Sequence, residues 1–478
     1  MLPQAARQRV EKIAGQVLRR EPGLSRADYF GPNVRVGMGA APHILIGDKS
    51  EIRLLAPAGQ DPLEYRIALL ARDGDLVVLA AERNRAYEGY LRDLLELNDL
   101  NVLRIPPPES GLPRPSAYRC LEDNAIFNRL LDIVRQDDCV TLLSFISTGL
   151  VWKLAKRLSD RSGRTVLVAG PPPNLTQRVN DKLWFAEIVK TVLGASATPP
   201  VYSAFGPAAL VGRVRKLAKK WEKLVIKVPD SAGSAGNFPL YTDTIKDLSA
   251  KDLYRYLFDT VSEIHQQDAY PLMVEVWDCN VLASPSVQLW IPDKEDGDPV
   301  IEGIYDQTTA GPGGKFVGAT SARLDPEHDK QVCAEALTLG LLFQNLGYFG
   351  RCSFDAVLAG VDRESAQLHW IECNGRWGGV SLPMTFLNRI FSVETMPDYV
   401  IWQHSDLDFP AMPFTEALTR LDSGLYKAGS DPEGIIFTSP TGIETGTGLQ
   451  MIALGWNEKE AMNLANRAYR CLTDSSER

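Results

Sequence analysis

The sequence has little histidine and no paired cysteine motif. Five histidines occur in 478 residues, and none is spaced with another in the manner of zinc ligands; the seven cysteines are scattered and form no CxxC pair. These absences argue against a zinc site and against a redox dithiol. An odd number of scattered thiols is typical of a reducing compartment, so we expect a cytoplasmic protein.

A long hydrophobic run and an excess of positive charge are also missing. The longest apolar stretch, residues 140–152, is interrupted by serine, threonine and glycine and is too short to span a bilayer. Residues 1–20 have the pattern of a charged amphipathic helix without the apolar core of a secretory signal. The net charge of −9, from 51 basic and 60 acidic residues, favours neither a nucleic-acid partner nor a membrane partner.

The composition that remains is that of a globular protein. Hydrophobic residues make up 45% of the chain and charged residues 23%, and the length suggests about two to four domains. Over residues 1–173, strand-like and helix-like segments alternate, which predicts a parallel sheet flanked by helices. The expected strands are 43–46, 65–69, 76–80, 102–105 and 140–145, and the expected helices are 86–98, 124–137 and 149–159.

Two strand-like segments, GRCSFDAVLAG (350–360) and LHWIECN (368–374), carry oxygen-bearing side chains. Alternate residues of a strand face the same side, so Glu372 and Asn374 project together, and Asp355 on the neighbouring strand can join them. Two carboxylates and an amide oxygen suit a hard cation such as Mg²⁺. Arg376 would lie on the same face and could pair with phosphate oxygens. The alternative is an antiparallel hairpin with a polar outer face.

A second stretch, LVIKVPDSAGSAGNF (224–238), places a lysine before a loop of small residues. Lys227 on its strand can set an ammonium against a phosphate while N–H groups of the loop approach it. The loop is neither a Walker A loop nor a GxGxxG motif, and taken alone a plain strand and turn is the alternative. The sequence has no GxSxG or Cys–His signature, so cations and carboxylates are the chemistry it offers.

Together these stretches resemble the ATP-grasp superfamily. The matched elements follow one another over about residues 180–390. Their shared order and spacing make the resemblance more specific than any single element would. The resemblance implies a helix that begins at Asn180-Asp181-Lys182, a flexible glycine loop, a hinge that holds adenine, and a metal site with Arg376 as the arginine of an ExNxR motif. The implied nucleotide-binding residues are Lys182, Lys227, Ser231, Gly233, Ser234, Gly236, Glu275, Val276, Trp277 and Asp278, and the implied metal ligands are Asp355, Glu372 and Asn374.

Two further cations are candidates for the chemistry. Lys315 follows glycines in the loop GPGGKF (311–316), where it could reach the transferring phosphoryl group or could simply mark a loop tip. Arg351 or Arg376 could grip a substrate carboxylate bidentately, and a surface salt bridge is the alternative for Arg351. Arg376, Lys315 and Arg351 are therefore the candidate catalytic residues.

The resemblance also implies a reaction. ATP-grasp ligases use ATP with Mg²⁺ or Mn²⁺ to phosphorylate a carboxylate, and an amine then attacks the acyl-phosphate to give an amide, ADP and phosphate. The expected partners are a small-molecule acid and an amine or peptide, with a homodimer as a possible assembly. In general layout the chain is similar to pheganomycin-type peptide ligases. The alternatives are an ATP-grasp carboxylase or carboxylate kinase, and a catalytically inactive nucleotide-binding protein.

The expected fold class is α/β and α+β, an ATP-grasp fold in three parts. Residues 1–178 are predicted to form a pre-ATP-grasp α/β domain, and residues 179–395 the ATP-grasp domain with a lid at about 200–275. Residues 396–478 are predicted to form a small β-rich domain with a strand pair at 434–438 and 449–454. The basic run RVRKLAKKWEK is read as an amphipathic helix over 210–222, because its apolar positions have helical spacing.

Overall fold

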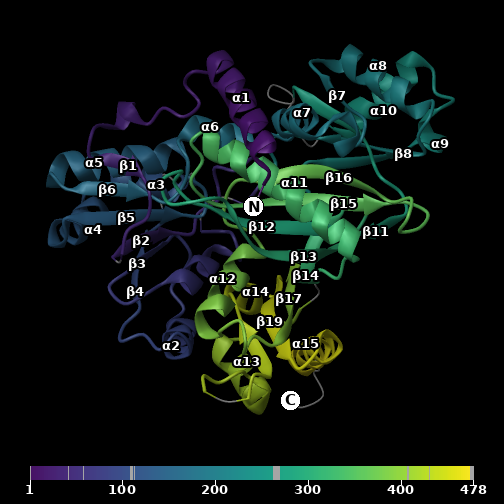
Figure 1. Cartoon of the computed structure of the whole chain (residues 1–478). Helices are drawn as coiled ribbons and strands as arrows, with labels where there is room; N and C mark the ends of the chain where they lie inside the picture. Colours follow the sequence, from purple (N-terminus) through teal and green to yellow (C-terminus); the bar gives the residue numbers. More distant parts are fainter. Residues whose placement is uncertain are drawn as a thin grey trace.

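The computed structural model of the protein describes residues 2–40, 42–56, 59–107, 111, 113–261, 270–405, 409–429 and 431–473. Within these residues the strands form three sheets, which Figure 1 shows as a parallel sheet at the left, a small sheet at the upper right and a long sheet between and below them. Helix α1 (Gln4–Arg20) packs along α11 (Pro326–Asn345). No helix among the described residues has the length and apolarity that a membrane crossing requires.

The first sheet is parallel throughout, as the alternating pattern predicts. Its strands are buried on both faces: Ile44 packs with α3, α4 and α5, whereas Leu45 packs on the opposite side. The strand order is β1 (Val34–Val36), β6 (Thr165–Val168), β5 (Cys139–Ser144), β2 (His43–Ile46), β3 (Leu76–Leu79) and β4 (Asn101–Arg104). The helices are η1 (Asp28–Phe30), α2 (Arg85–Leu94), α3 (Ser116–Glu122), α4 (Asn124–Gln136) and α5 (Gly149–Ser162).

One expected strand of this region is wrong. Residues 65–69 belong to η2 (Glu64–Leu70), a 3₁₀ helix, and not to a strand. All residues from Glu64 to Leu69 are buried, so the segment shows no alternation, and periodicity alone cannot separate a buried strand from a buried helix. The Glu64 carboxylate lies in the interior because it accepts hydrogen bonds from the backbone N–H groups of Ala80 and Ala81.

The second sheet is antiparallel and has the order β7 (Val201–Ala204), β10 (Leu272–Val276), β8 (Lys223–Lys227), β9 (Asn237–Tyr241). Helices α8 (Pro207–Ala218) and α10 (Ala250–Thr260) pack on one face, against Leu224, Ile226 and Val274. Alternation turns Val225 and Lys227 to the other face. The short α9 (Thr242–Ile245) follows β9. Residues 262–269 of the predicted lid lie outside the described residues, and the lid boundaries stay a prediction.

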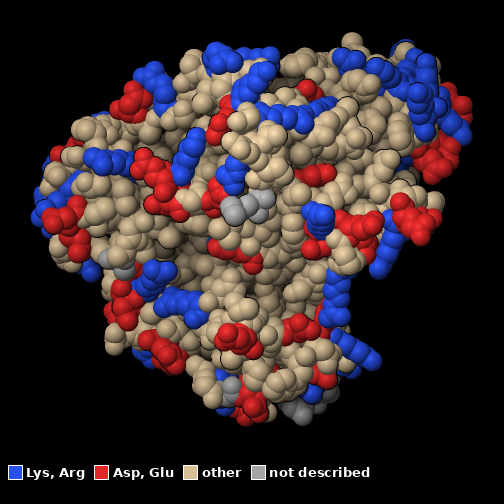
Figure 2. Space-filling view, in the orientation of Figure 1, with Lys and Arg blue, Asp and Glu red and all other residues tan. Residues whose placement is uncertain are grey.

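The first half of the basic run, residues 213–218, forms the end of α8, as predicted. The expected helix over 210–222 is too long, because α8 ends at Ala218 and β8 already begins at Lys223. The apolar residues Leu210, Val214 and Leu217 of α8 are buried, and its lysines and arginines lie on the outer side. Figure 2 shows this gathering of basic side chains at the upper right of the molecule, with acidic side chains beside it. Lys216 also lies over the ring of Tyr202, 4.3 Å from its centroid.

The third sheet is the long one, and every strand pair in it is antiparallel. Helix α11 covers part of it, with Leu339, Leu342 and Phe343 against Val287 and Phe354. Helices α6 (Pro173–Val179), α7 (Lys182–Leu193) and η3 (Ala195–Ala197) lead from the first sheet to the second. The strand order is β11 (Val281–Ala283), β15 (Gly350–Ala359), β12 (Pro285–Ile291), β13 (Val300–Ala310), β14 (Lys315–Ser321), β17 (Asp398–Ser405), β19 (Gly448–Gly455) and β18 (Gly434–Phe437), and β16 (Gln367–Asn374) pairs with β15.

The C-terminal residues continue this sheet. Strand β17 pairs with β14 on one side and with β19 on the other, and β18 and β19 form the strand pair that the sequence predicts. Their core is shared with the first sheet, since Ile436 and Ile452 belong to the same buried cluster as Leu45 and Val77. The helices here are α12 (Ser381–Ile390), α13 (Phe414–Leu421), η5 (Asp422–Gly424), α14 (Thr441–Thr445) and α15 (Glu458–Thr473). The boundaries at 178 and 395 stay predictions.

Candidate functional site

A cavity of about 640 Å³ lies where the three sheets meet. Its wall is formed by loops that follow strands of the first sheet, by the face of the second sheet that carries Lys227, and by strands β12 to β16 of the third. Side chains far apart in the sequence therefore face one space. Most of the predicted site residues are among those that line it.

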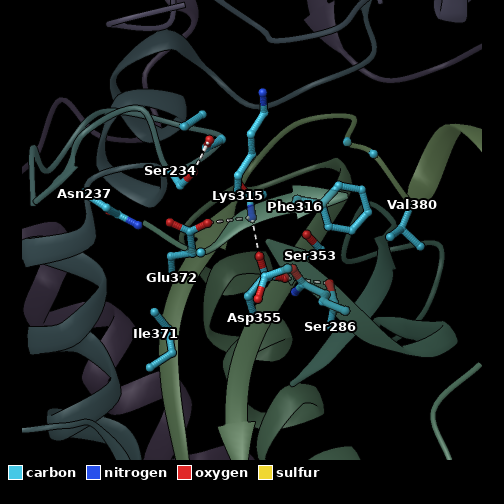
Figure 3. A pocket seen from close by; sticks show the side chains of 18 of the residues that line it. Ser234, Asn237, Ser286, Lys315, Phe316, Ser353, Asp355, Ile371, Glu372 and Val380 are labelled. Carbon is cyan, nitrogen blue, oxygen red and sulfur yellow. Dashed lines mark hydrogen bonds between the residues drawn. The ribbon is translucent and has the colours of Figure 1, made fainter. Parts of the chain in front are cut away.

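The predicted carboxylate pair stands on neighbouring strands in direct register. Asp355 of β15 lies opposite Glu372 of β16 (Figure 3). Asn374 joins them by donating from Nδ2 to Asp355 Oδ2 at 2.8 Å and to Glu372 Oε1 at 3.4 Å. Ser286 donates to Asp355 Oδ1 at 2.6 Å. The alternation of β16 thus brings Glu372 and Asn374 together as predicted.

The two carboxyl groups differ in their electrostatic surroundings. Burial, and next the charge of Glu372, raise the pKa of Asp355 to about 7. Burial would also raise the pKa of Glu372, but the opposite charges of Lys182 and Arg376 outweigh it and lower that pKa. Two close carboxylates in one wall of a cavity form a site where a cation would relieve their repulsion.

The donor set fits a divalent cation with oxygen ligands. The predicted ligands are two carboxylates and an amide. No group of three or more histidine, cysteine, aspartate or glutamate side chains suited to a metal occurs among the described residues. Asn374 directs Nδ2 to the carboxylates, and its Oδ1 accepts from Arg376. For Oδ1 to become a ligand, this amide has to rotate and exchange those two contacts.

Two cations, Lys182 and Arg376, lie beside the carboxylates and the amide. Lys182 begins α7 after Asp181, whose carboxylate caps the helix by accepting from Leu183 N at 2.8 Å. Lys182 Nζ lies 3.0 Å from Glu372 Oε2 and donates to Ser231 O at 2.5 Å. Arg376 donates to the side chains of Asn180 and Asn374. Helix α7 and the end of β16 are thereby joined at the cavity.

Lys227 forms an ion pair with Glu275 across strands β8 and β10. Glu275 is only 2% exposed, and burial raises its pKa against the opposing charge of Lys227. The sequence assigned the lysine to phosphate and the glutamate to the adenine hinge, and the structure places the two in contact. Both line the cavity.

Some residues of the small-residue loop after β8 line the cavity, and others face away from it. Gly233 and Ser234 line the cavity, and both adopt left-handed conformations, with φ of +63° and +62°. Ser231 and Gly236 are not among the lining residues: Ser231 donates to Val228 O at 2.8 Å, and a Cβ on Gly236 would collide with the Ser231 side chain. Ser231 and Gly236 therefore shape the loop from behind.

The predicted hinge follows β10 along the cavity wall. Val276, Trp277 and Asp278 all line the cavity. Lys223 lies over the Trp277 ring, 4.2 Å from its centroid, and Asp278 Oδ2 lies 2.9 Å from His369 Nδ1. Carboxylate, ring and backbone groups are thus held at one end of the cavity.

The two other candidate catalytic residues have different surroundings. Lys315 lines the cavity at the start of β14, next to Phe316 (Figure 3). Arg351 is not among the lining residues: it forms an ion pair with Glu302, donates to Thr385 Oγ1 at 3.1 Å, and lies between the rings of Trp290 and Trp377. The structure thus brings Lys315 to the carboxylates' cavity and places Arg351 in a buried ion pair.

Sequence reasoning did not single out the residues that the first sheet contributes. Lys49 and Asp61 follow β2, and Arg66 belongs to η2; all three line the cavity. The position of Lys49 just after a parallel strand could have revealed it, because ligands bind at the carboxyl ends of such strands. Arg66 gives no comparable signal, since its segment was read as a strand.

Comparisons with known proteins bear on the fold of the chain. The family model described as the pre-ATP-grasp domain matches residues 64–159. The search of curated proteins gives no match to the chain. The resemblance to pheganomycin-type ligases therefore stays a prediction.

Solved structures match nearly the whole chain at low identity. N5-carboxyaminoimidazole ribonucleotide synthetase from Thermus thermophilus has 14% identity and a TM-score of 0.51, over 90% of this chain and 98% of that one. A biotin carboxylase from Campylobacter jejuni, described as a beta-gamma-ATP complex, has 13% identity and a TM-score of 0.53, over 89% of this chain and 90% of that one. The ADP complex of N5-carboxyaminoimidazole synthetase from Staphylococcus aureus has 10% identity and a TM-score of 0.51, over 91% of this chain and 97% of that one. The protein thus has the ATP-grasp fold, of mixed α and β structure, with a pre-ATP-grasp domain in its N-terminal part.

Proposed function

We propose that the protein is an ATP-dependent, ADP-forming carboxylate–amine ligase. The observation that carries the proposal is the cavity that the Asp355–Glu372 pair lines together with Lys182, Lys227 and Arg376. Such a set stabilises the negative charge that spreads over phosphoryl oxygens during transfer. The fold agrees with this reading, because two solved structures of the same fold are described as a beta-gamma-ATP complex and a complex with ADP.

Nucleotide binding is assigned to the part of the cavity between the second and third sheets. Adenine lies along Val276 and Trp277, and Asp278 offers a carboxylate to the ribose hydroxyls. The phosphates lie between Lys182, Lys227 and the loop at Gly233 and Ser234, where backbone N–H groups and two ammonium groups meet them. Lys315 approaches the terminal phosphoryl group from β14.

Asp355, Glu372 and Asn374 would hold Mg²⁺ or Mn²⁺. When bound, the cation neutralises charge on the phosphate oxygens and fixes their position. Arg376 stands beside Asn374 and orients the reacting carboxylate or the phosphoryl group with its planar donors.

The reaction then has two steps. A carboxylate oxygen of the substrate acid attacks the γ-phosphorus, the bond to the β-phosphate oxygen breaks, and ADP leaves. The nitrogen of an amine attacks the resulting acyl-phosphate, loses a proton and displaces phosphate, which leaves an amide. An acid joined to an amino acid or a peptide amine is the proposed product.

The intermediate provides the test. With ATP, Mg²⁺ and a panel of carboxylic and amino acids, hydroxylamine should trap a hydroxamate, and the nucleotide product should be ADP. The amide should appear only when an amine is added. AMP and pyrophosphate as products would contradict the proposal. ADP without a hydroxamate for any acid would favour a carboxylase, and no ADP under any condition would favour an inactive nucleotide-binding protein.

The same test separates a carboxylate kinase from a ligase. A kinase would form ADP and a hydroxamate yet give no amide with any amine. Mass spectrometry of the products in the presence and absence of the amine distinguishes the two. Phosphate release that rises with amine concentration supports the ligase.

A further inference from the structure

Part of the cavity is not used by the nucleotide or the cation in the proposed function. This region, which we call the second subsite, is lined by Lys49, Asp61 and Arg66 from the first sheet's loops and by Gly379 and Gln403 from the third sheet's side. Hydrogen bonds from Arg66 to Gly379 O and to the Gln403 side chain hold these parts together. The second subsite is therefore a built wall whose parts come from three segments of the chain.

Among the residues that the structure describes, Arg66 is a buried cation with no carboxylate in direct ion-pair contact, although the charge of Asp61 acts on it. Its side chain is only 3% exposed, and both of its hydrogen-bond acceptors, Gly379 O at 2.6 Å and the Gln403 amide oxygen, are neutral. Its Nε has no hydrogen-bond partner, and no carboxylate lies within ion-pair distance of Arg66 in the described parts of the chain. Burial lowers the pKa of Arg66 to about 10.

This arrangement is costly unless an anion joins it. Burying a guanidinium without a carboxylate costs free energy that hydrogen bonds to neutral groups only partly offset. Arg351 provides the contrast within the same molecule, because it is also buried but forms an ion pair with Glu302. Arg66 lines the cavity whereas Arg351 does not, so an anionic ligand can reach Arg66.

Lys49 adds a second positive charge and Asp61 a negative one. Lys49 Nζ lies 2.9 Å from Asp61 Oδ2, and Asp61 Oδ1 accepts from Leu63 N at 3.0 Å. Burial lowers the pKa of Lys49 against the opposing charge of Asp61, and the positive charges of Arg66 and Arg376 lower it further. The second subsite thus has two cations of its own and one carboxylate.

The rest of the wall is apolar. Phe145, Phe316, Trp377, Val380 and Leu382 line the same cavity, and Lys49 Nζ lies 5.8 Å from the centroid of the Phe145 ring. Figure 3 shows Phe316 and Val380 beside each other at the edge of the carboxylate region. A ligand that matches this wall has a carboxylate, a positively charged group and an apolar body.

We propose that the second subsite binds the amine substrate, and that this substrate is an α-amino acid with an apolar side chain. Its carboxylate pairs with Arg66 and Lys49, its ammonium lies at Asp61, and its side chain packs on Phe145 and Leu382. The proposal rests on the proposed ligase function, because it assigns the second substrate of that reaction. Arg66 is a binding residue in this scheme and takes no part in phosphoryl transfer.

Calorimetric titration of the full chain with Mg²⁺ and ADP present tests the proposal without turnover. The probes are L-phenylalanine and L-leucine, each compared with its amide, which lacks the carboxylate, and with 3-phenylpropionate, which lacks the ammonium. We expect at least one of the two amino acids to bind, its amide to bind about tenfold more weakly or worse, and Arg66→Gln to reduce amino-acid binding by a similar factor. Binding of Mg²⁺–ADP to Arg66→Gln should stay within about twofold of wild type, which shows that the variant is folded.

Two further variants test whether Arg66 binds the amino acid or only supports the fold. Arg66→Lys should retain part of the amino-acid affinity because it keeps the charge. Arg389→Gln is the matched control, since Arg389 donates to the backbone carbonyl of Ala71 and is not among the cavity-lining residues. Should Arg66→Gln fail to fold, Lys49→Gln tests the same carboxylate contact, with weaker amino-acid binding as the expected result.

Clear results would overturn the proposal. It is wrong if neither amino acid binds the wild-type protein, if the amides bind as tightly as the acids, or if folded Arg66→Gln binds the amino acids as wild type does. Trapping of a hydroxamate without any amino-acid binding would leave the ligase function standing and reject the second subsite. Arg66-dependent amino-acid binding without ATP turnover would reject the ligase function and leave the second subsite standing as an amino-acid site.

Discussion

Lys182 Nζ lies 3.0 Å from Glu372 Oε2, so a cation assigned to phosphate and a carboxylate assigned to the metal neutralise each other across the cavity. Binding of ATP with Mg²⁺ would give Lys182 phosphate oxygens and Glu372 a divalent cation, replacing one ion pair by two stronger sets of contacts. The affinity for nucleotide and for Mg²⁺ should therefore be coupled through this pair.

The first prediction concerns Glu372. Glu372→Gln removes the charge that holds the cation, and we expect turnover at limiting Mg²⁺ to fall by about 100-fold. Phosphate release measured over a Mg²⁺ series checks it. The control is Glu187→Gln on α7, because the Glu187 side chain is exposed and pairs with Lys190 on the same helix. Wild-type turnover of Glu372→Gln at limiting Mg²⁺ would refute the assignment.

The second prediction concerns the buried pair of Lys227 and Glu275. Lys227→Ala leaves Glu275 buried without its cation, so we expect weaker ATP binding and a loss of about 3–5 kcal/mol in the free energy of unfolding. The double variant Lys227→Met with Glu275→Gln should recover most of the stability but not the ATP affinity. Denaturant unfolding and ATP titration of both variants separate the two effects. Recovery of ATP affinity in the double variant would remove Lys227 from the phosphate site.

The third prediction concerns the glycine loop. Gly233 has φ of +63°, a conformation that a β-branched side chain adopts only with strain, and it lines the cavity. Gly233→Val should slow turnover more than it weakens nucleotide binding, because the loop has to close over the phosphates. Gly212→Val on α8 is the control, since a Cβ at Gly212 meets no atom within 4 Å. Equal losses of turnover and binding would contradict this role for the loop.

The fourth prediction concerns pH and Glu64. Burial raises the pKa of Glu64 from 4.5 to about 7, although Ala80 N and Ala81 N donate to its carboxylate. Between pH 4.5 and 7, the folded protein therefore keeps a proton on Glu64 that the unfolded chain has already lost. The free energy of unfolding should fall over this window as pH rises, by up to about 3 kcal/mol, and stay level above it.

Glu64→Gln isolates this contribution. The variant has no proton to release, so its denaturation midpoint should depend less on pH across the same window. Glu82→Gln is the control, because Glu82 is exposed and its pairing with Arg104 lies at the surface. A wild-type pH profile in Glu64→Gln would show that another group carries the dependence.

The sequence predicted the parts of the site that lie within single elements. Strand alternation placed Glu372 beside Asn374, which is a local rule of backbone geometry. The helix start at Lys182 was implied by the resemblance, and the Asp181 cap gives its physical reason. The antiparallel pairing of β15 and β16 then brought Asp355 to them, as a neighbouring strand must.

The contacts that the sequence did not reveal join segments far apart in the chain. Arg66 meets Gly379 and Gln403 across 313 and 337 residues, and no local pattern encodes such a meeting. Arg351 shares its strand face with Ser353 and Asp355, so alternation alone would point it to the cavity. Glu302 on β13 forms an ion pair with it, and this depends on a sheet order that the sequence leaves open.

The continuity of the third sheet has a consequence for truncated forms of the chain. Gly318, Ala319 and Thr320 of β14 pair with β17, which lies beyond residue 395. A fragment that stops at residue 395 would present this strand's N–H and C=O groups as a bare edge, a ready template for pairing with another chain. Such a fragment should aggregate on expression. In the whole chain, β17 covers this edge of β14 and so prevents it from pairing with another molecule.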